Sequence, residues 1–148
     1  PDHILLKPGR LTNDEFEQIK KHTVYGYDAL SVSSQKMGNH SFLGLGMEIA
    51  YTHHEKWDGT GYPRGLARSD IPVSGRLMAL ADVYDALISK RVYKSPFSHQ
   101  KAVSIIRDER SCHFDPEIVD AFLRVEKQFR LIAYEFADFS EERENLAE

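Results

Sequence analysis

Residues 53–63 constrain this chain more than any other segment of it. They read HHEKWDGTGYP, so two adjacent histidines run directly into a loop that holds two glycines and a proline. Apolar residues precede the segment at helical spacing, and a glycine-rich loop is typical of a helix end. Neutral imidazole is the commonest metal ligand among side chains. The segment therefore predicts a helix that ends at a metal site, which is the kind of site a metal-dependent hydrolase needs.

The composition is that of one soluble globular domain. The chain has 148 residues, is 41% hydrophobic and carries a formal net charge of −4. This charge excludes the basic field that a long nucleic acid requires, and no apolar run reaches the roughly 18 residues of a membrane span. Cys112 is the only cysteine, so no internal disulfide can form, and a reducing cytoplasm is the expected location.

Helix signals recur along the chain, whereas the alternating pattern of strands is missing. Thr12 and Glu15 are spaced as a capping box, Ser98 is placed as an N-cap, and Asp115-Pro116 combines an N-cap with proline at the first helical position. We therefore predict an all-helical protein. We expect a loop from Ser33 to Ser41, a helix from about Val73 to Ser89, and a solvated acidic tail from Asp138 onward.

The periodicity also predicts which apolar residues face inward. One stripe continues into the histidine pair, so His54 shares a face with apolar residues, and His22 falls on or beside a buried face. The residues expected to face inward are Phe16, Ile19, Tyr27, Leu30, Leu43, Met47, Ala50, Val73, Leu77, Leu80, Ala81, Tyr84, Leu87, Ile88, Ala102, Ile105, Ile106, Ile118, Val119, Phe122, Leu123, Phe129 and Ile132.

Further candidate site residues lie outside the histidine pair. Asp82 and Asp85 share an edge of a largely apolar helix, and a carboxylate there needs a partner, which a metal ion would supply. Arg91 and Lys94 are cations that could hold a phosphate. The candidates have plainer alternatives: two unrelated histidines, one in the core and one at the surface, for His53 and His54, and a core histidine for His22. For Asp82 the alternative is a surface aspartate, and for the two cations a solvated turn.

Taken together, these motifs resemble the bacterial HD-GYP domain, a branch of the HD phosphohydrolase superfamily. Gly61-Tyr62-Pro63 is the glycine-tyrosine-proline of the family's name. The resemblance covers Pro1 to about Leu123. It rests on the segments Pro1–Gly9, Lys21–Thr23, His53–Leu66, Ile71-Pro72, Gly75–Leu87, Ser89–Lys94 and His113–Pro116.

The resemblance implies an all-α, HD-type helical bundle that hydrolyses cyclic di-GMP to pGpG, with GMP as a further product left open. It implies two or three divalent metal ions, iron or manganese, in the complete domain. His22, His53 and His54 correspond to ligands of one metal, and Asp82 corresponds to a ligand of its neighbour. The residues that correspond to the substrate pocket are Tyr62, Asp85, Arg91 and Lys94.

One departure from the family concerns its His-Asp dyad, because none of the seven histidines is followed by aspartate. We therefore expect residues 1–125 to be an N-terminally truncated HD-GYP domain and residues 126–148 to be a helix end and acidic tail. Without the dyad, the chain alone is expected to hold at most one metal ion and to be inactive. A truncated bundle exposes apolar surface, so a homo-oligomer is another expectation.

Two other functions stay open from the sequence. The domain could bind cyclic di-GMP or partners such as diguanylate cyclase domains without catalysis, using the glycine-tyrosine-proline loop as a docking surface. It could also hydrolyse another nucleotide, since a fold and its metals do not determine the substrate.

Overall fold

The computed structural model describes residues 2–37, 41–90 and 95–147. Helices make up their regular structure, and the only strand-like feature among them is an isolated bridge between Arg110 and Phe114. The predicted all-α class is therefore confirmed. The chain divides into two compact units, Pro1–Ala79 and Leu80–Glu148, and the division falls within helix α5 (Val73–Ile88).

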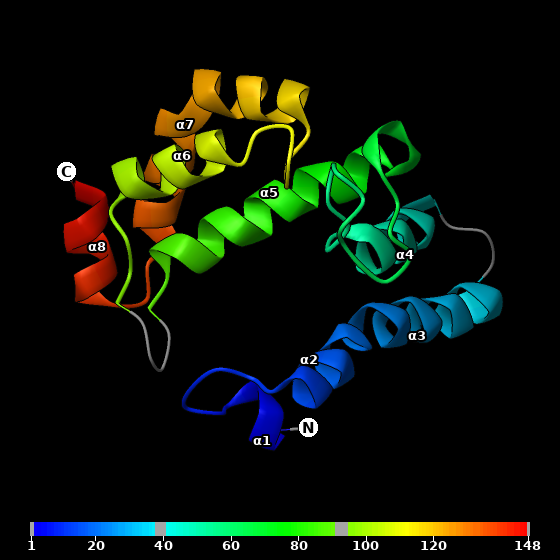
Figure 1. Ribbon diagram of the computed structural model, residues 1–148. Helices are drawn as coiled ribbons and strands as arrows, with labels where there is room; N and C mark the ends of the chain where they lie inside the picture. Colours follow the sequence, from blue (N-terminus) through cyan, green and yellow to red (C-terminus); the bar gives the residue numbers. More distant parts are fainter. Residues whose placement is uncertain (1, 38–40, 91–94, 148) are drawn as a thin grey trace. The chain divides into compact units, whose positions relative to one another are not determined.

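The first unit is built around a pair of helices, α3 (His22–Met37) and α4 (Ser41–Thr52), which run side by side (Figure 1). Glycine allows their close approach, since a Cβ at Gly26 would lie 3.3 Å from the Cβ of Ala50. The short helices α1 (Asp2–Leu5) and α2 (Asn13–Lys20) precede this pair. A 3₁₀ turn, η1 (Arg68–Asp70), leads into α5.

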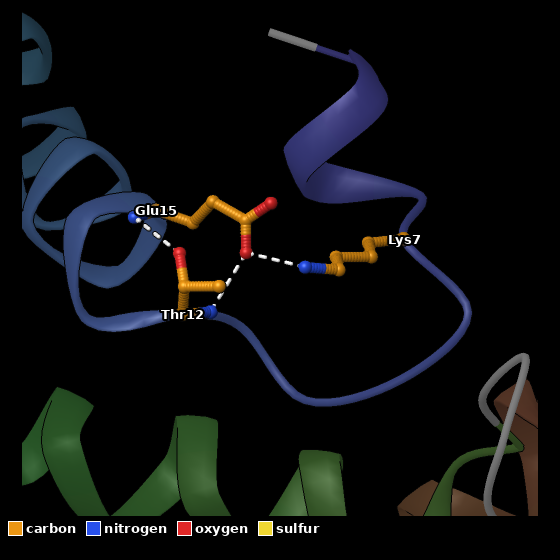
Figure 2. A network of polar contacts seen from close by, with 3 residues as sticks. All are labelled: Lys7, Thr12 and Glu15. Carbon is orange, nitrogen blue, oxygen red and sulfur yellow. Dashed lines mark hydrogen bonds and ion pairs between the residues drawn. The ribbon is translucent and has the colours of Figure 1, made fainter.

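The start of α2 carries the predicted capping box. The Glu15 N–H donates to Thr12 Oγ1 at 3.3 Å, and the Thr12 N–H donates to Glu15 Oε2 at 2.7 Å. Lys7 Nζ adds an ion pair to the same carboxylate oxygen at 2.6 Å (Figure 2). This network ties the loop that follows α1 to the first turn of α2, and it holds the pKa of Glu15 at about 2, chiefly through the Lys7 hydrogen bond and then the Thr12 N–H.

The second unit has a continuous apolar core. It is assembled from the end of α5 together with α6 (His99–Asp108), α7 (Pro116–Phe136) and α8 (Ser140–Ala147). The predicted caps at Ser98 and Asp115 are both formed. The buried core residues are Leu80, Tyr84, Ile88, Ala102, Ile106, Phe114, Val119, Phe122, Ala137 and Leu146.

A buried polar chain crosses this second core. The Tyr84 hydroxyl lies 2.8 Å from His99 Nδ1, and His99 Nε2 contacts Glu126 Oε2. Burial, followed by the nearby Glu126 carboxylate, raises the pKa of Tyr84 above its usual range. The three groups satisfy one another's hydrogen bonds, which is the condition under which polar groups can be buried at low cost.

The prediction of a solvated acidic tail is wrong for part of that segment. Residues 140–147 form α8, in which Glu142 and Leu146 are buried. Glu142 accepts backbone N–H groups from Lys90 at 2.6 Å and from Asp138 at 3.0 Å. Composition gives the number of acidic residues but not whether a carboxylate accepts backbone N–H groups, so it cannot distinguish a buried Glu142 from a solvated one.

Other boundaries and faces also differ from the predictions. The loop expected from Ser33 is helical up to Met37, because α3 runs on through small polar residues that tolerate a helix. Four residues expected to face inward are exposed instead. Their exposed fractions are 45% for Phe16, 57% for Val73, 52% for Leu77 and 58% for Ile132. Periodicity identifies residues on one helix face, but it does not say whether another element covers that face.

Helices of the described segments lack the combination of length and apolarity that crossing a membrane requires. The proposed division at residue 125 stays a prediction, although α7 continues through that position without interruption.

Candidate functional site

The structure brings together the three histidines singled out from the sequence. Helix α4 ends at Thr52, so His53 and His54 lie in the turn that follows it, and His22 is the first residue of α3. One ring nitrogen from each histidine lies within 4.8 Å of the others. The His53 and His54 ring centroids lie 4.0 Å apart, so these adjacent residues place their rings together at the helix end, where a local adjustment is expected.

Backbone carbonyls orient two of these rings. His22 Nδ1 lies 2.6 Å from the carbonyl oxygen of Ile19, and His53 Nδ1 lies 3.0 Å from that of Ile49 and 3.1 Å from that of Ala50. A carbonyl only accepts, so each Nδ1 carries the proton and each Nε2 presents a lone pair. A backbone carbonyl on the far nitrogen is the usual support of a metal-binding histidine.

The spacing of these lone pairs fits a metal ion. The Nε2 atoms of His22 and His53 lie 3.3 Å apart, and two unprotonated nitrogens cannot hydrogen-bond each other. With metal–nitrogen bonds of about 2.1 Å, this spacing gives an angle of about 100° at the ion, between the octahedral and tetrahedral values. His22 is exposed and the other two are partly buried. The sequence predicts His22 on or beside a buried face; the side chain is exposed, next to the buried Thr23, because α2 ends at Lys20 and a new helix begins at His22.

A buried glutamate holds the loop that follows the histidines. Glu55 is 1% exposed, and its two carboxylate oxygens accept the N–H groups of Arg64 at 2.7 Å and of Leu66 at 3.0 Å. Glu55 lies within the 53–63 motif, and its role was missed from the sequence. Its signal was available, since a carboxylate between a metal-binding pair and a glycine loop is well placed to cap backbone donors.

Gly61 is required by a close approach of two backbones. A Cβ there would lie 2.3 Å from the backbone nitrogen of Lys56 and 2.5 Å from the Cα of Glu55. Both atoms belong to the main chain and cannot move aside like a flexible side chain. The loop turns further at Gly59, whose φ of 83° lies in the left-handed region that favours glycine.

Tyr62 lies against the histidine cluster. Its ring centroid is 4.9 Å from that of His54 with a 33° tilt, and its N–H donates to the His54 carbonyl at 3.1 Å. The ring of Phe16 meets Tyr62 edge to face at 6.0 Å. The loop therefore places an aromatic wall beside the candidate metal ligands.

The remaining predicted site residues lie either in the second compact unit or outside the described residues. Asp82 and Asp85 belong to α5 within the second unit, where Asp82 is partly buried and Asp85 is exposed. Asp85 accepts from Ser89 Oγ at 3.4 Å and borders a mainly apolar cavity of about 250 Å³. Arg91 and Lys94 lie outside the described residues. The roles predicted for all these residues stay predictions.

Two relatives resemble the chain in sequence along most of its length. A cyclic di-GMP phosphodiesterase of Vibrio cholerae is 58% identical over 138 residues, which are 93% of this chain and 28% of the relative. A cyclic di-GMP phosphodiesterase of Thermotoga maritima is 50% identical over 128 residues, covering 86% of this chain and 33% of the relative. The chain thus spans about a third of the length of the curated relatives it matches.

The fold also has a counterpart among solved structures. A crystal structure of a cyclic GMP-AMP specific phosphodiesterase of V. cholerae superposes with a TM-score of 0.60 at 16% sequence identity, over 95% of this chain and 35% of that one. At this identity the likeness concerns the fold alone. The profile described as HD domain matches residues 1–118, and with it the resemblance seen in the motifs is confirmed: the chain belongs to the HD domain family.

Proposed function

We propose that this chain is the metal-binding part of a phosphodiesterase that hydrolyses cyclic di-GMP in the bacterial cytoplasm. The observation that carries the proposal is the convergence of His22, His53 and His54, two of them with Nε2 lone pairs oriented by backbone carbonyls. The activity named for the two relatives at 58% and 50% identity supports the choice of substrate.

In this proposal the three histidines bind one divalent ion, and Asp82 binds a neighbouring ion in the complete domain. HD phosphohydrolase domains depend on metals, and imidazole ligands suit iron while carboxylates suit manganese. A bound metal ion supplies Lewis-acid activation of water and of the phosphoryl group. The carbonyls of Ile19 and Ile49 keep the ligand rings in the required tautomer.

The protein's other groups position the substrate. Tyr62 confines the nucleotide beside the histidines, and Asp85 lines the pocket. Arg91 and Lys94 neutralise the phosphates, arginine as a planar fork and lysine as a point charge. Water attacks phosphorus and the bond to one 3′ oxygen breaks, so the ring opens to pGpG, and a second hydrolysis yields GMP. Interaction with diguanylate cyclase domains is a further role of the loop under this proposal.

The test uses the full-length protein that contains this chain, loaded separately with iron and manganese. Incubation with cyclic di-GMP should release pGpG, followed by chromatography, and a chelator should stop the reaction until metal is restored. His53→Ala should lower kcat/KM at least about 100-fold, because losing a ligand costs more than losing a supporting contact. His3→Ala is the matched control, since His3 is exposed on α1.

Two other results would replace the proposal. Tight binding of cyclic di-GMP by the metal-loaded protein without any product would make the domain a binding module. Faster turnover of 3′3′-cGAMP than of cyclic di-GMP would make it a phosphodiesterase of a different cyclic dinucleotide.

A further inference from the structure

An aromatic and cationic cluster lies next to the histidines, and two of its three members, Phe16 and Lys20, have no role in the function described so far. It consists of Phe16 and Lys20 on α2 together with Tyr62 of the loop. The Phe16 and Tyr62 rings meet edge to face at 6.0 Å. Lys20 Nζ lies 5.4 Å from the centroid of Phe16 and 5.7 Å from that of Tyr62. We call these three residues the α2 shelf.

The α2 shelf has the properties of a base-binding surface. Phe16 is 45% exposed, although its spacing predicts a core position, so a large aromatic surface stays open beside the candidate site. Tyr62 links the shelf to the histidines through its contact with His54 at 4.9 Å. Exposed aromatic rings beside a cation are the elements with which proteins stack nucleobases.

Lys20 adds a chemical preference to this surface. An ammonium has three donors and no acceptor. Guanine presents two acceptors, O6 and N7, on one edge, whereas adenine presents a donor in place of O6. Lys20 can therefore satisfy guanine and must leave the adenine amino group unpaired. Its present partner is Glu17, whose Oε1 lies 2.5 Å from Lys20 Nζ and whose side chain is 65% exposed. The Lys20 side chain is 25% exposed. An ion pair with one exposed partner is weak enough to be exchanged for a ligand.

We infer that the α2 shelf binds one base of the cyclic dinucleotide, with Phe16 stacking on it and Lys20 selecting guanine over adenine. This inference deepens the proposed function and rests on it. It assigns substrate selectivity to α2, a helix that contributes none of the three clustered histidines.

The experiment measures binding and turnover of cyclic di-GMP and cyclic di-AMP by the metal-loaded full-length protein. Lys20→Met should reduce the ratio of guanine to adenine affinity about tenfold. Phe16→Leu should weaken both ligands about tenfold and leave the ratio unchanged, because it removes only the stacking face. Glu17→Gln, on the exposed side chain that competes for Lys20, should strengthen cyclic di-GMP binding.

Lys21→Met is the matched control, since Lys21 is exposed and follows Lys20 directly. It should leave the affinity ratio unchanged. An unchanged ratio in Lys20→Met would overturn the inference, as would an equal loss for both ligands, which indicates a phosphate contact. A thermal unfolding midpoint measured for each variant separates loss of fold from loss of contact, and Glu17→Gln still decides the question if Lys20→Met does not fold.

The outcome is distinguishable from failure of the proposed function. If Lys20→Met hydrolyses cyclic di-GMP with unchanged selectivity, the base-binding role of the α2 shelf is wrong and the proposed phosphodiesterase activity is retained. If the protein binds a dinucleotide without hydrolysing it, the proposed phosphodiesterase activity is wrong, and the affinity ratios still test whether the α2 shelf selects guanine. Absence of binding to either dinucleotide overturns both.

Discussion

The two compact units of this chain are held together in different ways. In the unit Leu80–Glu148, the buried apolar side chains form one cluster that includes Phe114 and Ile106, and buried polar groups such as His99 and Glu142 accompany it. In the unit Pro1–Ala79, the fully buried side chains include Glu55 and Thr23, and few large apolar residues besides Ile71 are buried. The second unit is therefore stabilised mainly by burial of apolar surface, whereas the first depends on polar contacts and close backbone packing.

The candidate site lies in the unit with the smaller apolar core. The positions of its groups depend on the course of the main chain. The histidines lie at helix ends, Glu55 accepts backbone N–H groups, and Gly61 lies close to the backbone of Lys56. A site that depends on backbone geometry gains stability when a ligand cross-links its elements, because binding to the folded state shifts the folding equilibrium. A bound metal ion should therefore stabilise the first unit as buried apolar side chains stabilise the second.

The largest expected effect is in the apolar unit. Phe114→Ala should lower the free energy of unfolding by about 3–5 kcal/mol, since a 2% exposed aromatic leaves a cavity when truncated. Phe42→Ala is the control, because Phe42 is 80% exposed and should cost at most about 0.5 kcal/mol. Urea unfolding followed by circular dichroism measures both. Equal costs for the two variants would contradict the description of the second core.

In the unit Pro1–Ala79, which holds the candidate site, the comparable variant removes a polar side chain. Glu55→Ala should cost about 3 kcal/mol, because two backbone N–H groups lose a charged acceptor. It should also displace the loop and weaken metal binding, measured by urea unfolding and metal titration. Glu144→Ala, an exposed glutamate on α8, should change neither quantity. A stable Glu55→Ala protein with normal metal affinity would show that the loop does not need this anchor.

Metal removal should separate the two kinds of stabilisation. At a metal concentration 100-fold above Kd, binding should add about 2.7 kcal/mol to the free energy of unfolding, and a chelator should remove it. His53→Ala should abolish the metal-dependent part alone, whereas Phe114→Ala should leave that part intact. Calorimetric midpoints with and without metal test this. A metal increment that survives in His53→Ala would exclude the histidine cluster as the binding site.

The smallest expected effect concerns pH and the network of Lys7, Thr12 and Glu15. The pKa of Glu15 is about 2 in the folded chain and has its ordinary value of 4.5 in the unfolded chain. The ionised Glu15 therefore stabilises the folded state at pH values above this ordinary pKa. This stabilisation is lost as the pH falls through about 2. Lys7→Met should raise the Glu15 pKa toward its ordinary value, measured by carboxyl NMR titration. An unchanged Glu15 pKa would mean that the Thr12 N–H alone holds the carboxylate.

Much of the local structure could be predicted because its causes are local. The capping box of Thr12 and Glu15 and the caps at Ser98 and Asp115 each depend on residues within three positions of one another. Capping of this kind is readable from spacing. The length of α3 and the helix α8 were missed, because small polar or acidic residues are compatible with both helix and coil, and the deciding contacts of Glu142 come from Lys90 and Asp138.

For the candidate site, residue types and spacing were sufficient to single out His22, His53 and His54. The resemblance to the HD-GYP domain implied that these three side chains share one metal, but spacing alone could not bring their nitrogens together, since His22 lies 31 positions before His53 and begins a separate helix. Nor could it predict the exposure of Phe16, because a periodic pattern does not reveal what covers a face. The aromatic contact between Phe16 and Tyr62 was therefore missed.

The helical class, the family and the chemical nature of the ligands follow from the amino-acid sequence alone, because helix signals, glycine-rich loops and imidazole chemistry are properties of short segments. Other features are visible in the tertiary structure alone. The ring nitrogens of three histidines lie within 4.8 Å of one another, Glu55 anchors the loop, and Lys20 lies over the ring of Tyr62. These relations join residues far apart in the chain. Packing of helices determines such distances, and no local pattern encodes them.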